Sequence, residues 1–470
     1  IMPHGSPHTQ HTRKPEEPVY PVTMNEQQHG EKATQSSRPR IRPADTTDER
    51  PVSVSARLGR LQFHESGKFR VLQFADIQDG PKVSSDTIRL IEASLDTTRP
   101  DIAIFTGNQI AGYDTAYADT FRKRRWSNGW AAVQQSTDRR AAERHAADLE
   151  RTREKVRGMI AQFTAPLVER GIPWAVTYGN HDFQCGLDNA ELDAIYREFP
   201  GCLNPESTAA SMDHPRTMPG SGLLDQMVYP CEPGTFALPV SDVDHTHTVL
   251  GLVLLDSGDY ARSGGYGAPS GKGFEFLRRV PELLGEQSML FQHLALPQYY
   301  DLLREVPANA ANAIQGYRAF DGHSYVLDET KTEPGSYLGE GISCSDHDYG
   351  EFALLKETRG YFAVTVGHDH RNGFVGTHNG VMLVATPTCG FGSYGPVPEK
   401  RAARLFEFDI RHPHEPRTQL LEFGSLVGKP NSKKAYAYGM TSVKPDSEGM
   451  DLLHKPGLWS WLTGVFRRRR

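Results

Sequence analysis

The chain has 470 residues, of which 37% are apolar and 23% are charged, and its formal net charge is -6. This length allows about three domains or one large α/β domain with tails, and the apolar share is enough for a sizeable core. The negative net charge argues against a nucleic-acid-binding protein, so we expect no nucleic-acid partner.

The cysteines and the ends of the chain bear on the compartment. No CxxC pair occurs, which excludes zinc-ribbon and thioredoxin-like sites. The odd number of five predicts free thiols, with a bridge among Cys185, Cys202 and Cys231 as the alternative. The sequence shows neither a signal sequence nor an apolar run of about 18 residues, so we expect a cytoplasmic protein; a segment upstream of Ile1 stays open.

The first part of the chain divides by composition. Residues 1–57 are rich in Pro, Thr, Gln, Arg and His, which predicts a disordered arm before a domain at 58–425. Within the domain, FRVLQFADIQDG (69–80) is typical of a buried strand that ends in a polar loop. A predicted helix at 87–100 and a second strand at 101–110 follow. The order strand, helix, strand predicts a parallel βαβ unit.

From residue 115 onward, the sequence predicts helical, loop and strand segments in turn. Residues 115–165 are predicted to be a helical insertion, and IPWAVTYGNHD (172–182) is predicted to be a third strand. Residues 185–235 are rich in Gly, Pro and Ser, which predicts a loop insertion. The remaining predicted strands lie at 247–259, 288–297, 361–370, 380–390 and 404–410.

Two basic segments stand apart from this pattern. RKRRW (122–126) predicts a solvated helix start, with a nucleic-acid contact as the weaker alternative. The tail at 426–470 ends in GLWSWLTGVFRRRR (457–470), which is too short to span a bilayer. We expect a weakly docked tail there, with contact to an anionic membrane surface as the alternative.

Five predicted strands end in loops that begin with Asp, Asn, Gln or His. These residues are Asp76, Gln78, Asn108, Asn180, His181, His293, His368 and His370. Open α/β sheets place their ligand sites at the carboxyl ends of strands, so these side chains are predicted to converge. Oxygen and imidazole donors without thiolate suit Zn, Mn or Fe. In the absence of a nucleophile elbow or a phosphate-binding loop with Lys, metal-assisted hydrolysis is the remaining reaction class.

The order of FADIQDG, TGNQI, YGNHD, FQHLALPQY and GHDHRNGF along the chain resembles the calcineurin-like metallophosphoesterase family, in particular its small purple-acid-phosphatase-like branch. The resemblance covers about Lys68 to Ile410. It implies a four-layer αββα sandwich of two mixed sheets and one or two divalent transition metals per chain. It also implies a phosphomonoesterase or phosphodiesterase that uses metal-activated water and a phosphorylated small-molecule or protein substrate.

The resemblance also assigns roles to individual residues. Asp76 and His370 would hold the first metal, and Asn180, His293 and His368 would hold the second. His181 would stabilise charge or protonate the leaving oxygen, and Asp182 would orient His181.

Two positions depart from the family pattern, and both fall on the metal site. Gln78 stands where the family has His, and Asn108 stands where it has the bridging Asp. Asp79 or Asp114 could supply the missing charge from nearby loops. The alternative to hydrolysis is a degenerate phosphoesterase that binds a phosphorylated ligand with little or no turnover.

Overall fold

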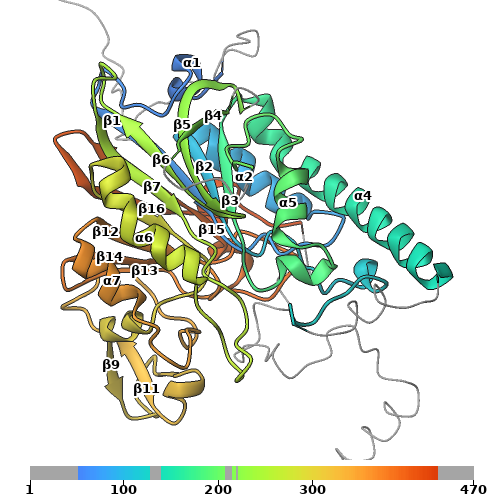
Figure 1. Cartoon of the computed structure of the whole chain (residues 1–470). Helices are drawn as coiled ribbons and strands as arrows, with labels where there is room; N and C mark the ends of the chain where they lie inside the picture. Colours follow the sequence, from blue (N-terminus) through green and yellow to red (C-terminus); the bar gives the residue numbers. More distant parts are fainter. Residues whose placement is uncertain (1–50, 127–138, 207–213, 219–220, 432–470) are drawn as a thin grey trace, which may run out of the picture. The chain divides into compact units, whose positions relative to one another are not determined.

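The computed structural model describes residues 51–126, 139–206, 214–218 and 221–431 (Figure 1). The predicted arm at 1–57 lies mostly outside this part of the chain. Its last residues are helical, because Ser53 caps α1 (Val54–Leu58) by accepting from the Ala56 amide. The arginine tail at 457–470 lies outside the described residues. None of the described helices combines the length and apolar character needed to cross a bilayer.

The first sheet contains five strands in the order β16-β15-β1-β2-β3. Its parallel core consists of β1 (Lys68–Phe74), β2 (Ile102–Thr106) and β3 (Trp174–Thr177). Helix α2 (Ser85–Thr98) connects β1 to β2 and so confirms the predicted βαβ unit. The antiparallel strands β15 (Ala402–Asp409) and β16 (His412–Glu422) complete the sheet.

The second sheet contains eight strands in the order β13-β14-β12-β8-β7-β6-β5-β4. Strands β7, β8, β12 and β14 are parallel to their neighbours among these four, and the others pair antiparallel. The strands are β4 (Arg216–Met218), β5 (Leu223–Glu232), β6 (Thr235–Ser241), β7 (Thr248–Leu254), β8 (Ser288–Phe291), β12 (Tyr361–Val366), β13 (Phe374–His378) and β14 (Val381–Ala385).

The alternation of side chains along the strands builds three apolar layers. In β1, Phe69 and Val71 face the core between the two sheets, whereas Leu72 and Phe74 face the helices. Strands buried on both faces read as nearly continuous apolar runs, as β2 (IAIFT) does. The predicted four-layer αββα sandwich is confirmed.

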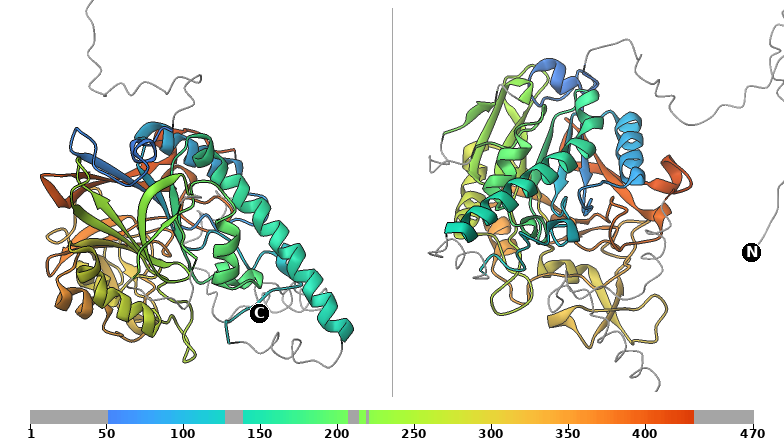
Figure 2. Two further views of the ribbon diagram at one scale, coloured as in Figure 1. Left: turned by 45° about the horizontal axis from the view of Figure 1, so that its top comes forward. Right: turned by 90° about the vertical axis from the view of Figure 1, so that its right-hand side faces the viewer.

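Helices cover the outer face of each sheet. Helices α2, α4 (Arg139–Glu169) and α5 (Asn189–Tyr196) pack on the first sheet (Figure 2). Helices α6 (Gly271–Leu284) and α7 (Glu351–Thr358) pack on the second. Short helices occur at α8 (Phe423–Leu426), η1 (Thr115–Tyr117), η2 (Asp182–Cys185), η4 (Pro297–Leu302), η5 (Arg318–Phe320) and η6 (Pro398–Lys400).

Two features differ from the sequence predictions. The predicted loop at 185–235 contains α5, β4 and β5, because a capping box between Asp188 and Glu191 starts the helix and β5 pairs with β6. The Gly and Pro content concealed these elements; Pro230 lies inside β5. A third sheet was also missed: it contains β9 (Leu303–Val306), β10 (Ile314–Gln315) and β11 (Ser324–Leu327).

Candidate metal and phosphoester site

The predicted site residues converge where strands of the two sheets end. Asp76, Asn108 and Asn180 follow β1, β2 and β3 of the first sheet, and His293 and His368 follow β8 and β12 of the second. The structure therefore brings five separate segments together, as the sequence predicted. All of these side chains are buried.

The backbone at these strand ends adopts an uncommon conformation. Asp76, Gln78, Asn108 and His368 have φ values of 53°, 43°, 52° and 67°. Non-glycine residues at positive φ are costly and cluster at functional sites. Gly107 permits the close packing, since a Cβ there would lie 2.6 Å from His293 Nδ1. The turn at Gly367 and His368 also explains how His368 and His370 share one site despite alternating in sequence.

Backbone carbonyls fix the tautomers of two histidines. His293 Nδ1 lies 2.9 Å from the Thr106 carbonyl oxygen, and His370 Nδ1 lies 2.6 Å from that of Tyr394. A carbonyl can only accept, so each Nδ1 carries a proton, and Nε2 is the nitrogen of each ring that is left to bind a ligand. A backbone carbonyl that binds the Nδ1 proton in this way is typical of metal-binding histidines.

Both Nε2 atoms lie close to oxygen atoms, and that of His293 also lies close to His368 Nδ1, which can donate to it. His293 Nε2 lies 3.1 Å from Asn180 Oδ1, and His370 Nε2 lies 3.3 Å from Asp76 Oδ1. Asp76 Oδ1 is buried and has no hydrogen-bond partner among the described residues. Two opposed lone pairs in a buried site repel each other unless a cation lies between them. The donor set therefore fits a cation.

The remaining donors complete one site. His368 Nδ1 lies 3.1 Å from His293 Nε2. Gln78 donates from Nε2 to the Tyr113 hydroxyl, while its buried Oε1 has no partner in the described part of the chain. Among the described residues, no group of three or more His, Cys, Asp or Glu side chains has the arrangement of a metal-holding cluster.

Asn108 differs from its expected role as a metal ligand. Its Oδ1 accepts from the His181 amide at 2.8 Å, which turns Nδ2 toward Asn180 Oδ1 at 3.1 Å. In this orientation Asn108 offers the site a proton and no lone pair. The residues thus fit one divalent ion, and they do not fit a second ion bridged through Asn108.

The charges of the site shift the pKa values of Asp76 and His293. Burial raises the pKa of Asp76, but nearby His293 and His370 outweigh it and the net shift is downward. Burial lowers the pKa of His293, and the carboxylate of Asp76 only partly opposes this. Asp76 is therefore ionised, and it is the only carboxylate among the predicted metal ligands.

His181 is positioned by a residue that the sequence analysis did not identify. Its Nδ1 lies 2.7 Å from Gln184 Oε1, and Gln184 Nε2 donates to the Lys123 carbonyl. Gln184 can only accept at Oε1, so His181 Nε2 has the lone pair. Burial lowers the pKa of His181 to about 3, which keeps the ring neutral. The only available signal was spacing: Gln184 lies one helical turn after His181.

Asp182 does not hold the His181 ring, contrary to the expectation. Its carboxylate accepts from the backbone amides of Asn108, Gly179 and Ile110 at 2.8, 2.7 and 3.0 Å. Burial raises the pKa of Asp182 to about 7, against the effect of these amides. Asp182 therefore ties the ends of β2 and β3 together.

The two acidic residues considered as charge replacements are used locally. Asp79 Oδ2 accepts from the Ser84 amide and the Thr87 hydroxyl at the start of α2. Asp114 Oδ1 caps η1 through the Ala116 amide. The tyrosines around the site were also missed: Tyr266 and Tyr394 lie against His368 and His370 at ring distances of 4.6 and 4.1 Å.

Comparisons with known proteins agree with these motifs. No family model matches the chain. The chain is similar to "Probable inactive purple acid phosphatase 29" of Arabidopsis thaliana, with 22% identity over 77% of this chain and 82% of the relative. "Probable inactive purple acid phosphatase 28" of the same plant is 24% identical over 74% and 77%. "Phosphatase DCR2" of Saccharomyces cerevisiae is 24% identical over 69% of this chain and 47% of that protein.

Solved structures with a similar arrangement are more distant. A dimetal phosphatase from Danio rerio is 11% identical, covers 76% of this chain and 99% of its own, and has a TM-score of 0.36. Purple acid phosphatase PPD1 from yellow lupin is 10% identical over 77% and 52%, with a TM-score of 0.35. The sequence relatives confirm the resemblance to the purple-acid-phosphatase-like branch.

Proposed function

From the relationship of this chain to the purple-acid-phosphatase-like metallophosphoesterases, we propose that it acts on phosphate esters at a site that holds one divalent metal ion. One observation carries the proposal: the Nε2 lone pairs of His293 and His370 face the oxygens of Asn180 and Asp76 at 3.1 and 3.3 Å. A cation held between these nitrogen and oxygen atoms would relieve their mutual repulsion.

The residues that would hold the ion are Asp76, Asn180, His293, His368 and His370. Gln78 Oε1 would be an additional oxygen ligand. Imidazole and oxygen donors favour Fe, Mn or Zn. An ion there supplies Lewis-acid polarisation of a phosphoryl oxygen. Because Asp76 is the only carboxylate of the set, the loaded site keeps a positive charge. That charge attracts the phosphoryl anion of a small molecule or a protein.

His181 and Asn108 would contact the phosphoryl group from the first sheet. The Nδ2 group of Asn108 can donate to a phosphoryl oxygen. His181, held at Nδ1 by Gln184, has an unprotonated Nε2 that lies 3.4 Å from Asn180 Nδ2, so it would hold no proton for the leaving oxygen. This differs from the leaving-group acid that the family pattern implies.

A second candidate function is phosphoester binding without turnover. The orientation of Asn108 favours binding without turnover. In the family this position bridges two metals, whereas in this chain the Asn108 side chain presents its N–H donor to the site. The word "inactive" in the names of the two Arabidopsis relatives points the same way.

Metal analysis and an aryl-phosphate assay test the proposal. Protein purified without chelators should contain one ion per chain, and turnover with added Mn, Fe or Zn should disappear in His181→Ala. The matched control is His247→Ala, since His247 is exposed outside the site. Phosphate binding by the loaded protein without turnover would establish the second candidate. A protein that holds no metal and binds no phosphate would contradict both.

A further inference from the structure

Tyr260 contacts one of the predicted metal ligands from a segment outside the motifs of the sequence. It lies in the loop between β7 and α6, and its side chain is 4% exposed. Its hydroxyl accepts from Asn180 Nδ2 at 2.7 Å, and Asn180 is itself fully buried. The Tyr260 hydroxyl therefore bears on how the Asn180 amide is oriented.

The orientation of the Asn180 amide decides whether it can bind a cation. Its Oδ1 lies 3.1 Å from His293 Nε2 and accepts from Asn108 Nδ2 at 3.1 Å. Its Nδ2 faces the other way, toward Tyr260 and, at 3.4 Å, toward His181 Nε2. An inverted amide would present N–H groups to the metal position and to the N–H group of Asn108. Only the observed orientation supplies a ligand, because an amide binds a cation through its oxygen.

The Tyr260 hydroxyl stabilises this orientation from the nitrogen side of the amide. A buried N–H group without an acceptor is costly, and a hydroxyl oxygen can accept. The other neighbour of Asn180 Nδ2, His181 Nε2, lies at 3.4 Å, which is long for a hydrogen bond. Without the hydroxyl, the amide would keep one long contact at its nitrogen and would turn more freely.

An aromatic ring and a cation hold the ring of Tyr260. It stacks on Tyr266 with ring centroids 5.7 Å apart, and Tyr266 lies edge-on to His368 at 4.6 Å. The Arg124 guanidinium carbon lies 3.6 Å from the centroid of the Tyr260 ring. A cation above an aromatic face is attracted by the ring electrons. The position of the hydroxyl is therefore set by contacts other than the one with Asn180.

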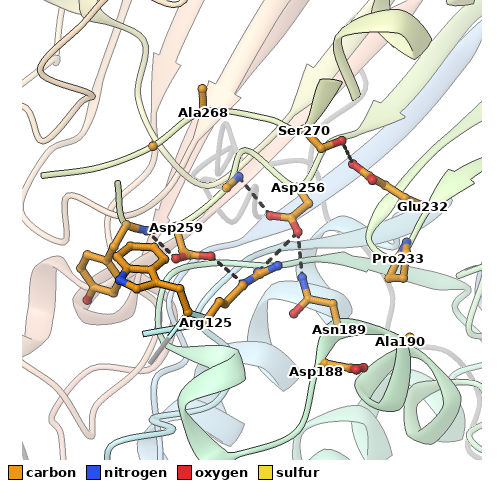
Figure 3. Close-up of a pocket in the computed structure, with 14 residues that line it drawn as sticks. Arg125, Asp188, Asn189, Ala190, Glu232, Pro233, Asp256, Asp259, Ala268 and Ser270 are labelled. Carbon is orange, nitrogen blue, oxygen red and sulfur yellow. Dashed lines mark hydrogen bonds and ion pairs between the residues drawn. The ribbon is translucent and has the colours of Figure 1, made fainter. Parts of the chain in front are cut away.

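An ion pair holds the backbone next to Tyr260. Asp259 Oδ1 accepts from the Tyr260 amide at 2.6 Å, and Asp259 Oδ2 lies 2.6 Å from Arg125 Nε (Figure 3). Arg124 and Arg125 belong to the run at 122–126, for which the sequence predicts a solvated helix start. That prediction is wrong: the run is not helical, because these two arginines contact the loop that carries Tyr260.

We propose that Tyr260 is a positioning residue of the metal site, whose hydroxyl keeps Asn180 Oδ1 turned toward the ion. The inference rests on the proposed function. It adds to that function a residue that lies in none of the motifs on which the family resemblance depends. Tyr260 acts through Asn180 and does not itself contact the ion, so metal affinity is the property that its hydroxyl should set.

The Zn affinity of the full chain, measured by equilibrium dialysis, tests this proposal. Tyr260→Phe keeps the ring between Tyr266 and Arg124 and removes only the hydroxyl. Its Zn affinity should be about tenfold lower, which is the cost of one buried N–H group that loses its partner. An unchanged Zn affinity would overturn the proposal.

The matched control is Tyr361→Phe. Tyr361 is 3% exposed, and its hydroxyl donates to the Leu277 carbonyl at 2.8 Å. It is the first residue of β12, whereas His368 follows the other end of that strand. The control therefore removes a buried tyrosine hydroxyl away from the site, and it should bind Zn as the unaltered chain does.

The Asn180→Asp background separates positioning from packing. A carboxylate presents an oxygen in either orientation, so it does not need the hydroxyl in order to bind a cation. Adding Tyr260→Phe to Asn180→Asp should therefore change Zn affinity by less than about twofold. An equal loss in both backgrounds would mean that the hydroxyl only supports the fold, and it would overturn the proposal.

The outcomes separate this inference from the proposed function. If the unaltered chain and Tyr260→Phe bind Zn equally tightly, the positioning role is overturned and the proposed metal site stands. If Tyr260→Phe weakens Zn binding but phosphate esters neither bind nor react, the positioning role stands and the proposed function fails. If the unaltered chain binds no Zn, both are overturned.

Discussion

The two sheets contribute very different chemistry to one site. The first sheet supplies Asp76, Gln78, Asn108 and Asn180, which are one carboxylate and three amides. The second supplies three imidazoles: His293, His368 and His370. On the imidazole side, backbone carbonyls bind the Nδ1 protons of His293 and His370, which is a contact typical of metal-binding histidines. The amide side has a single carboxylate, Asp76.

The backbone has the same uncommon conformation on the amide side and on the imidazole side. Gln78 and Asn108 have φ values of 43° and 52°, and the metal-site residue His368 of the other sheet has a φ of 67°. The packed strands around them hold these uncommon conformations whatever the side chain is. An amide in place of a carboxylate changes charge and hydrogen-bond polarity without moving the chain. Fold and chemical capacity are therefore separable at this site.

The largest expected effect comes from replacing the two amides Gln78 and Asn108 by the residues of the family pattern. The double change Gln78→His with Asn108→Asp should raise the metal content from one ion to two. Aryl-phosphate turnover should rise about a hundredfold, since charge stabilisation at a reacting centre is worth that much. Metal analysis and steady-state kinetics measure both. An unchanged ion count would show that the two sides differ for another reason.

Removing a histidine of the imidazole side should strongly weaken metal binding. His293→Ala deletes the donor that contacts both Asn180 and His368, and we expect metal affinity to fall by about a hundredfold or more. Equilibrium dialysis with Zn measures it, with His247→Ala as the control. Affinity within a few-fold of the unaltered chain would contradict the assigned ligand set.

Gln184 offers a smaller effect through positioning. Gln184→Leu removes the acceptor for His181 Nδ1, so the ring loses its fixed tautomer, and phosphate affinity or turnover should fall about tenfold. Gln184→Glu keeps an acceptor and adds a charge that raises the pKa of His181. The pH profile should shift upward in Gln184→Glu. A purely structural role for Gln184 would leave that profile in place.

Metal binding by the site should depend on pH. Protons displace a metal only below the pKa of its ligands, and the pKa values of Asp76 and His293 are both lowered in the fold. The ion should therefore be retained below pH 6.5, near which an ordinary imidazole protonates. Metal retention measured by dialysis across a pH series tests this. Half-loss at or above about pH 6.5 would contradict it.

The smallest effect concerns the apo-protein. Asn108→Asp alone replaces the amide donor to Asn180 Oδ1 by a carboxylate oxygen, so two acceptors face each other. We expect the free energy of unfolding to fall by about 1–2 kcal/mol in chelator, and added metal should recover part of it. Urea unfolding measures the loss. Asn312→Asp, at an exposed position, is the matched control.

Much of the fold was predictable because its signals are local. The apolar runs of β1, β2, β8 and β12 identified buried strands, and the polar residues directly after them identified the site. The capping box that starts α5 is a local signal that was overlooked in a segment rich in Gly and Pro. The third sheet was missed because its strands are only two to four residues long and pair only with one another. The role of Gln184 and the true contacts of Asp182 also depend on distant backbone groups.

The sequence by itself determined which donor types are present and which two are missing, since residue identity fixes charge and lone pairs. Only the tertiary structure decided the direction in which each group points. The His181 amide turns the Asn108 nitrogen into the site, and two carbonyls expose the Nε2 atoms of His293 and His370. Hydrogen-bond polarity depends on partners from other segments, and those partners meet only when the two sheets pack together.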